Sequence, residues 1–202
     1  MTNPKLIAIV LLIGLYSCGE RQTENRNHMA AIELNNDAMR MVRFLDNRDS
    51  AQKGISLLDR ATSLDSNYFL GYYNKLIFYN QLREYDNAII TVNKLIRLKP
   101  NAHDLYLTGG LLREKTGDST GAKAFFEKSL TLSNQVLETM NPGNPDYEMV
   151  IGNKAMNLIM LNERSTAVQL LKDMYESQTG DEAKGNILKL MNSSKRELIE
   201  QF

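Results

Sequence analysis

Short helical patterns separated by polar turns run along most of this chain, and residues 69–102 show them most clearly. In the first half of that stretch, apolar residues recur every three or four positions, which places them on one face of a helix. They are Tyr72, Leu76, Tyr79 and Leu82. A polar turn at 83–86 follows, then a second apolar stripe that stops before Pro100, because proline lacks the amide hydrogen that a helix needs. The pattern predicts two helices folded into a hairpin.

The same pattern recurs along the chain at a fixed spacing. Gly54, Ala88 and Ala122 are 34 residues apart, and a helix-spaced apolar series follows each of these small residues. A step of 45 residues then leads from Ala122 to the matching Ala167, so 11 extra residues separate the third unit from the fourth. Internal repeats of this length indicate a solenoid, in which each unit packs mainly on its neighbours.

The 34-residue unit resembles the tetratricopeptide repeat family, which favours aromatic, small and proline residues at set positions. The matching residues are Tyr72, Tyr79, Tyr85, Ala88, Pro100, Tyr106, Gly110, Gly117, Ala122, Phe126 and Leu130. Leu76, Leu95 and Asn134 depart from the family pattern, which prefers glycine, alanine and proline there. The resemblance implies an all-α fold: a right-handed superhelix of antiparallel helical hairpins, with about four repeats and C-terminal capping helices.

These patterns divide the chain as follows. A helical repeat domain spans 29–202, and its parts are repeats at about 35–68, 69–102, 103–136 and 148–180 and a C-terminal cap at 181–202. The last helix of the third repeat is expected to continue through 135–138, until the proline-containing run Asn141–Pro145 breaks it. Asp49 or Ser50 is a candidate cap for the second helix, and Ser194 and Glu197 have the spacing of a capping box.

The first residues are typical of a processing segment and not of the fold. Lys5 precedes an uncharged apolar run at 6–16, which is shorter than the roughly 20 residues that cross a bilayer. The run leads into Cys18 and Gly19, and this resembles a bacterial lipoprotein box, although Tyr16 departs from the small residue usual there. The alternative is an ordinary secretory signal with an incidental cysteine.

By the lipoprotein resemblance, 1–17 is a signal peptide and Cys18, the single cysteine of the chain, becomes the lipidated first residue. More than one acyl chain would give stable membrane attachment. The polar stretch 18–28 is expected to be a flexible tether. Residue 19 is glycine and not aspartate. By the sorting pattern of some Gram-negative envelopes, this indicates that the protein is anchored in the outer membrane, facing the periplasm.

Composition and charge argue against several classes of function. Lysine plus arginine and aspartate plus glutamate both number 24, and no basic stripe with interleaved aromatics is present, so nucleic-acid binding is not expected. The two histidines, His28 and His103, have no identifiable nucleophile or second ligand beside them. Gly109, Gly110 and Gly117 lack the pattern of a phosphate loop. We therefore expect no enzyme activity, no metal and no cofactor.

The remaining candidate surface is the groove that the first helices of stacked hairpins form. By the tetratricopeptide resemblance, the groove residues are Met39, Arg43, Tyr73, Ile77, Asn80, Leu107, Leu111, Glu114, Met156 and Ile159. The lysine and asparagine of the family's carboxylate clamp are absent, and the groove is expected to be apolar. Either a partner's helix or extended peptide occupies it, or the chain's own terminal helices do.

Two functions follow from this groove. The first is a membrane-anchored interaction module, an adaptor or assembly factor of the bacterial cell envelope that binds another envelope protein or peptide. The alternative is an envelope binding protein for a lipid or another apolar small ligand. The sequence indicates neither the partner nor the oligomeric state.

Overall fold

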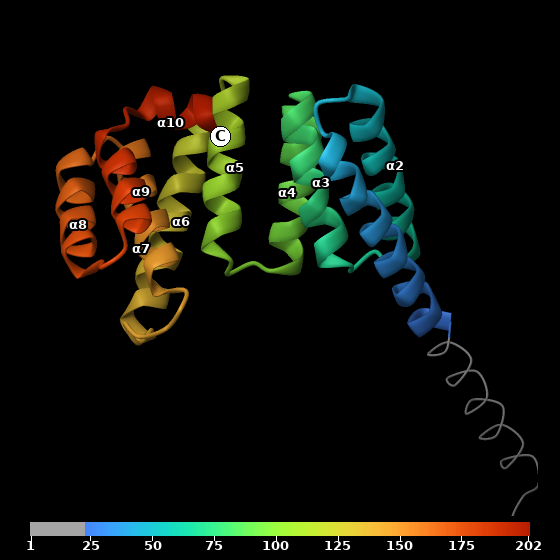
Figure 1. Cartoon of the computed structure of the whole chain (residues 1–202), viewed down its shortest axis with the longest axis horizontal. Coiled ribbons are helices and arrows are strands. Elements are labelled where there is room, and N and C mark those ends of the chain that lie inside the picture. Colours follow the sequence, from blue (N-terminus) through green and yellow to red (C-terminus); the bar gives the residue numbers. More distant parts are fainter. Residues whose placement is uncertain (1–22) are drawn as a thin grey trace, which may run out of the picture. The chain divides into compact units, whose positions relative to one another are not determined.

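The structure is a computed structural model that describes residues 23–202, and this part of the chain is helical without a strand (Figure 1). Two compact units are present, Met1–Glu84 and Tyr85–Phe202. We call them unit 1, described from residue 23, and unit 2. The boundary lies in the predicted polar turn at 83–86, and each unit is considered by itself.

Unit 1 is built from a helix over 23–40, a 3-10 turn η1 (Met41–Phe44), and the helices α2 (Arg48–Leu64) and α3 (Phe69–Leu82). α2 packs against both η1 and α3. Small residues allow this close packing: a Cβ atom added to Gly54 of α2 would lie 2.4 Å from the ring of Phe78 in α3. The main core cluster of the unit consists of Ala38, Ala51, Leu58 and Phe78.

The start of unit 1 differs from the predicted tether at 18–28. Residues 23–28 are helical and continue into 29–40, whereas 18–22 lie outside the described residues. The polar side chains of this first turn are mostly exposed, and His28 fixes the helix to the unit through the Asp65 carboxylate, 2.6 Å away. Burial would raise the pKa of Asp65, but the hydrogen bonds with His28 and the Asn67 amide lower it.

The cap of α2 also differs from the expectation. Asn47 is the N-cap, and its side chain accepts a hydrogen bond from the amide of Ser50. Asp49 and Ser50, the predicted caps, lie within the first turn because the helix begins at Arg48, earlier than expected.

Unit 2 is a row of packed helices, in which each helix from α4 to α9 contacts the next (Figure 1). They are α4 (Tyr85–Leu98), α5 (His103–Thr116), α6 (Ser119–Thr139), α7 (Tyr147–Met160), α8 (Arg164–Ser177), α9 (Asp181–Asn192) and α10 (Lys195–Gln201). α10 breaks the order, because it returns from α9 to contact α5. The predicted capping box of α10 is present between Ser194 and Glu197.

The 11 extra residues between the third and fourth repeats extend α6 and the loop after it. α6 has 21 residues, whereas α4, α5, α7 and α8 each have 14. As predicted, the helix runs through 135–138 and ends before the proline-containing loop. The packing of α5 on α6 needs glycine, because a Cβ atom at Gly110 would lie 2.4 Å from the ring of Phe126.

The helical hairpins thus form as the repeat pattern predicts, and the all-α fold class is confirmed for residues 23–202. Within each unit the small residues and the aromatic rings that face them set how closely the helices pack.

Candidate functional site

In unit 1 the first helices of the two hairpins lie side by side. The Asn74 side chain in α3 donates a hydrogen bond to the Asn35 side chain of the 23–40 helix, at 2.8 Å. Further along, Gln81 donates to Asp46 at 3.4 Å. These contacts identify the inner face of the unit, where the predicted residues Met39, Arg43, Tyr73, Ile77 and Asn80 belong by their repeat positions.

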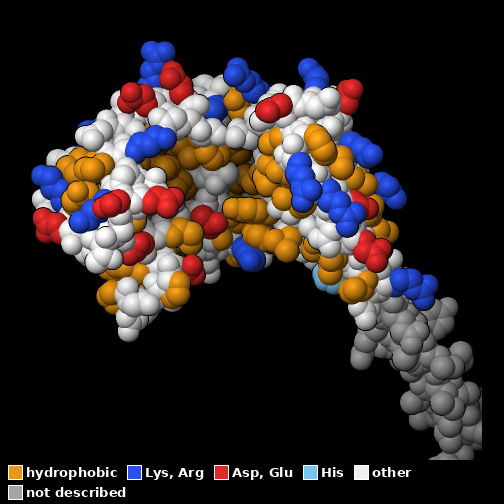
Figure 2. All heavy atoms as spheres, viewed as in Figure 1, with side chains coloured by type: hydrophobic (Ala, Val, Ile, Leu, Met, Phe, Trp, Pro, Cys, Tyr) orange, Lys and Arg blue, Asp and Glu red, His pale blue; other side chains and the backbone are white. Residues whose placement is uncertain are grey.

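This inner face carries exposed apolar side chains on α3. Leu70 is 54% exposed and Tyr73 is 43% exposed, and the Tyr73 ring stacks on that of Phe69 with centroids 6.0 Å apart. Together with Ile77, which is partly exposed, they follow helical spacing along one side of α3. We call Phe69, Leu70, Tyr73 and Ile77 the α3 patch. Figure 2 shows hydrophobic side chains at the surface of both units on the face drawn.

The other predicted residues of unit 1 differ in exposure. Met39 and Asn80 are half-buried, and Arg43 in η1 is exposed. Phe44 beside Arg43 is 60% exposed, the highest value among the large apolar side chains of this unit. Unit 1 therefore presents aromatic and aliphatic surface with a basic group on the neighbouring helix.

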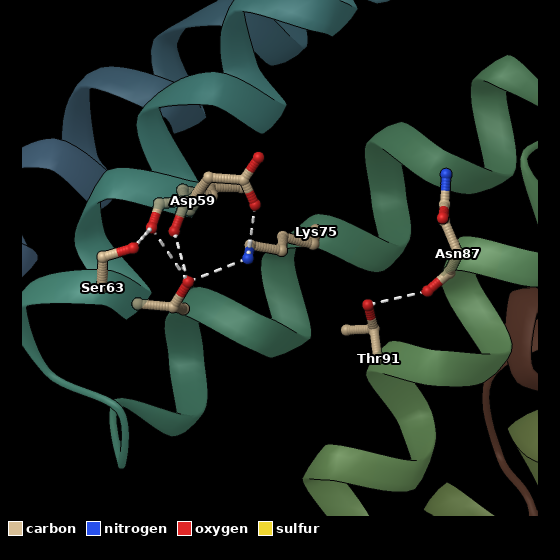
Figure 3. A network of polar contacts seen from close by, with 7 residues as sticks. Asp59, Ser63, Lys75, Asn87 and Thr91 are labelled. Atoms are coloured by element: carbon tan, nitrogen blue, oxygen red, sulfur yellow. Dashed lines mark hydrogen bonds and ion pairs between the residues drawn. The ribbon is translucent and has the colours of Figure 1, made fainter.

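An ion pair between a buried lysine and an exposed aspartate holds α3 on α2 (Figure 3). The Lys75 ammonium lies 2.7 Å from the Asp59 carboxylate and donates to the Thr62 hydroxyl at 2.8 Å. The Lys75 side chain is only 8% exposed, and these partners replace the water that it has lost. Burial, together with the charges of Asp59 and Glu84, raises the pKa of the Tyr79 hydroxyl to about 12. This tyrosine is therefore neutral at physiological pH.

In unit 2 three of the five predicted groove residues lie inside the core. Leu107 and Leu111 of α5 and Ile159 of α7 are 5%, 3% and 3% exposed, and Met156 packs against the same cluster. Glu114 is also covered, with its side chain 10% exposed. Contact of these five residues with a partner stays a prediction, and in this structure another part of the chain already covers them.

The covering part is the predicted C-terminal cap, α9 and α10. Ile187 of α9 and Leu198 of α10 belong to the same buried cluster as Leu107, Leu111 and Ile159. Lys195 at the start of α10 forms an ion pair with Glu114 at 2.7 Å. The sequence predicted the helices but not their position, because an amphipathic pattern does not indicate which apolar face a helix covers.

Arg164 is a residue that the sequence analysis missed. Its guanidinium donates hydrogen bonds to the carbonyl oxygens of Met191 and of Ser193, the latter at 2.6 Å, and so fixes the segment between α9 and α10. No local sequence signal identifies such a contact, because the arginine and its acceptors are far apart along the chain.

Unit 2 also contains an open cavity of about 450 Å³ between α7 and α8. Apolar side chains and two carboxylates line it: Pro142, Tyr147, Ile151, Leu170, Met174, Glu148 and Asp173. The carboxylates are hydrogen-bonded by glutamine side chains, Gln178 to Glu148 and Gln169 to Asp173. The volume of the cavity is in the range of small-molecule binding sites.

The described residues show no group of three or more His, Cys, Asp or Glu side chains that could hold a metal ion. His103 is 8% exposed, and its Nδ1 has no hydrogen-bond partner within 23–202. Burial lowers the pKa of this imidazole despite the neighbouring Asp104 carboxylate. No helix within the described part of the chain is long and apolar enough to cross a bilayer.

Comparison with known proteins supports the repeat assignment. The family model described as "Tetratricopeptide repeat" matches residues 71–102 and 103–136. Repeats of this type bind peptide or protein partners, and the match indicates no catalytic family. A search of curated proteins finds no match.

Solved structures with a similar fold include three helical repeat proteins. "MamA protein" is 26% identical, with a TM-score of 0.51, over 57% of this chain and 61% of that one, so this chain spans about three fifths of it. "PilW, widely conserved type IV pilus biogenesis factor" is 16% identical with a TM-score of 0.54, over 80% and 70%. "YrrB: a TPR protein with an unusual peptide-binding site" is 18% identical with a TM-score of 0.50, over 91% and 87%. Residues 71–136 thus match the tetratricopeptide repeat model, and the helical repeat fold is shared with these solved structures.

Proposed function

We propose that this protein is a membrane-anchored interaction module of the bacterial cell envelope that binds a peptide or helix of another envelope protein on the inner face of unit 1. The observation that carries the proposal is the α3 patch, with Leu70 and Tyr73 both exposed on a fold built from interaction repeats. Contiguous exposed apolar surface on a soluble domain often marks a binding site.

The chemistry of the α3 patch fits an apolar partner segment. The stacked rings of Phe69 and Tyr73 offer a rigid contact area, and Tyr73 adds a hydroxyl that can form a hydrogen bond at the edge of the contact. Arg43, exposed in η1, adds a positive charge to the same unit. A helix with apolar residues at three- and four-residue spacing, flanked by an acidic residue, would complement this surface. YrrB, described with a peptide-binding site, is a precedent for peptide binding by this fold, although not for these residues.

The test is affinity capture from envelope extracts with the full-length chain and two variants. Leu70→Ala/Tyr73→Ala removes exposed surface, and we expect it to lose the specific partner. Ile90→Ala is the matched control, because Ile90 on α4 is 66% exposed and lies outside the α3 patch. An unchanged set of captured proteins with the Leu70/Tyr73 variant would exclude the α3 patch as the binding site.

The proposed anchor is tested separately. Cys18 lies outside the described residues, and its lipidation rests on the sequence resemblance. Replacing Cys18 with serine is expected to release the protein from the membrane fraction, and separation of inner from outer membranes would test the proposed outer-membrane location. A Cys18→Ser protein that stays in the membrane would contradict lipid anchoring.

A second candidate function, binding of a lipid or another apolar small ligand, is favoured by the cavity between α7 and α8. The cavity is lined by apolar side chains and two carboxylates, which would suit an apolar molecule that carries a positive charge. Native mass spectrometry of protein purified from its natural membrane would detect such a ligand. Protein without added mass would argue against this function.

A further inference from the structure

The apolar face of unit 2 is occupied by a short helix from its own chain. α10 has seven residues, and isolated helices of that length are not stable in water, so its contacts with α5 and the core cluster hold it in place. Leu198 and Ile199 of α10, and Phe202 just after it, pack in or against this cluster. They follow the three- and four-residue spacing by which an amphipathic helix binds a groove.

The polar contacts of α10 add selectivity to this apolar contact. Glu114 is nearly buried, and its carboxylate accepts a hydrogen bond from Ser119 at one oxygen and pairs with Lys195 at the other. A buried carboxylate is costly without a cation, so the site favours a helix with a basic residue in its first turn. Lys115, next to Glu114, lies 6.0 Å from the centre of the Phe202 ring.

The attachment of α10 is local. Arg164 holds the carbonyl groups of Met191 and Ser193 just before α10, and Ser194 begins the helix with its capping box. Among the helix-to-helix contacts of unit 2, α10 contributes mainly those with α5, whereas the hairpins from α4 to α9 pack on one another without it. Moving α10 away would therefore remove Leu198 from the buried cluster that it shares with Leu107 and Leu111, while the repeat packing remains.

We propose that α10 is an internal pseudo-ligand, and that the face of α5 beneath it is a second docking site. Its partner is an amphipathic helix with the chemistry of α10: a basic residue in the first turn, then apolar residues three, four and seven positions later. This inference rests on the proposed function as an interaction module, but it concerns a different surface, and binding requires that the partner displace α10.

The test uses a fluorescent peptide with the sequence of residues 194–202 and the full-length chain. In the variant Lys195→Glu/Leu198→Asp the internal helix is weakened, and we expect saturable binding of the peptide. The wild-type chain should bind at least about tenfold more weakly, because its site is already occupied. A peptide of the same composition in scrambled order is the control. Lys195→Ala, a milder change at a partly exposed side chain, replaces the double variant if that one does not fold.

A charge exchange separates docking from general adhesion. Glu114→Lys in the full-length chain should bind the peptide that carries glutamate in place of Lys195 more tightly than the native peptide, reversing the preference of the weakened variant. Equal binding by wild type and variant, no binding by a folded variant, or no reversal would each show that α10 is a structural cap only. The probe needs no natural partner, so failure here leaves the capture experiment on the α3 patch unaffected.

Discussion

Units 1 and 2 use the same repeat positions in opposite ways. In unit 1 the inner-face residues Tyr73 and Ile77 of α3 are exposed and partly exposed, whereas Leu107 and Leu111, which lie 34 positions later in α5, are buried in a cluster to which α9 and α10 contribute. A repeat position therefore determines the direction of a side chain but not whether solvent reaches it. The covering segment decides that, and it comes from elsewhere in the chain.

The largest expected effect is on stability, when one inner-face residue of each unit is replaced by alanine. Leu111→Ala should destabilise the protein by about 2–5 kcal/mol, because it leaves a cavity in a closed core. Tyr73→Ala should cost about 0.5 kcal/mol or less, since it is a surface substitution. Urea unfolding followed by circular dichroism measures both. Equal losses would mean that the two faces do not differ in solution as they do in the structure.

A second pair of substitutions tests what the units have in common. Gly54→Ala in unit 1 and Gly110→Ala in unit 2 each place a Cβ atom 2.4 Å from a buried phenylalanine ring, so each should cost about 1–3 kcal/mol. Gly152→Ala in α7 is the control: its Cβ meets open space, and removing a helical glycine should stabilise by up to about 1 kcal/mol. Thermal unfolding of the three variants gives the comparison, and a stabilised Gly110→Ala protein would contradict the close packing.

The buried cation of unit 1 provides a third test. Asp59→Ala leaves the Lys75 ammonium without its carboxylate and should cost about 1–3 kcal/mol. Adding Lys75→Met should recover most of the loss, because an apolar side chain of similar size needs no counter-charge. Hydrogen exchange resolved to α2 and α3 locates the effect. If the double variant is less stable than Asp59→Ala alone, Lys75 stabilises the protein through contacts other than this ion pair.

The smallest expected effect is a pH dependence in unit 2. Burial lowers the pKa of His103 below its ordinary 6.5, so the unfolded chain binds a proton more readily than the folded one. The stabilising contribution is complete above pH 6.5 and is lost as the pH falls towards the folded-state pKa, by no more than about 1.4 kcal/mol per pH unit for one proton. His103→Leu should flatten the stability profile in this range. An unchanged slope would assign the dependence to other groups.

Local features were predictable from the sequence because they depend on neighbouring residues. The hairpins, the end of α6 before the proline-containing loop and the capping box at Ser194 all follow from spacing and turn chemistry. The cap at Asn47 was missed by two or three positions, since helix starts are poorly marked where several capping residues occur together. The helix at 23–28 was missed because polar residues show no apolar stripe, and a distant contact between His28 and Asp65 helps to hold it.

The candidate site was predictable only in part. Repeat spacing identified Tyr73 and Ile77 as inner-face residues of α3, and their stacked and exposed surroundings became visible only in the structure. For unit 2 the sequence left two occupants open. The pairing of Lys195 with Glu114, which brings α10 onto α5, connects residues with no local relation, so no pattern in the chain reveals it.

The glycines that face phenylalanine rings have a consequence for how such a chain can diverge. The rings of Phe78 and Phe126 fill the space that a Cβ atom at Gly54 and at Gly110 would need. A larger residue at either glycine becomes acceptable only after the ring opposite has shrunk, so the two members of a pair are constrained to change in a set order. Among related chains, alanine or serine at the glycine position should therefore occur together with leucine or a smaller residue in place of the phenylalanine.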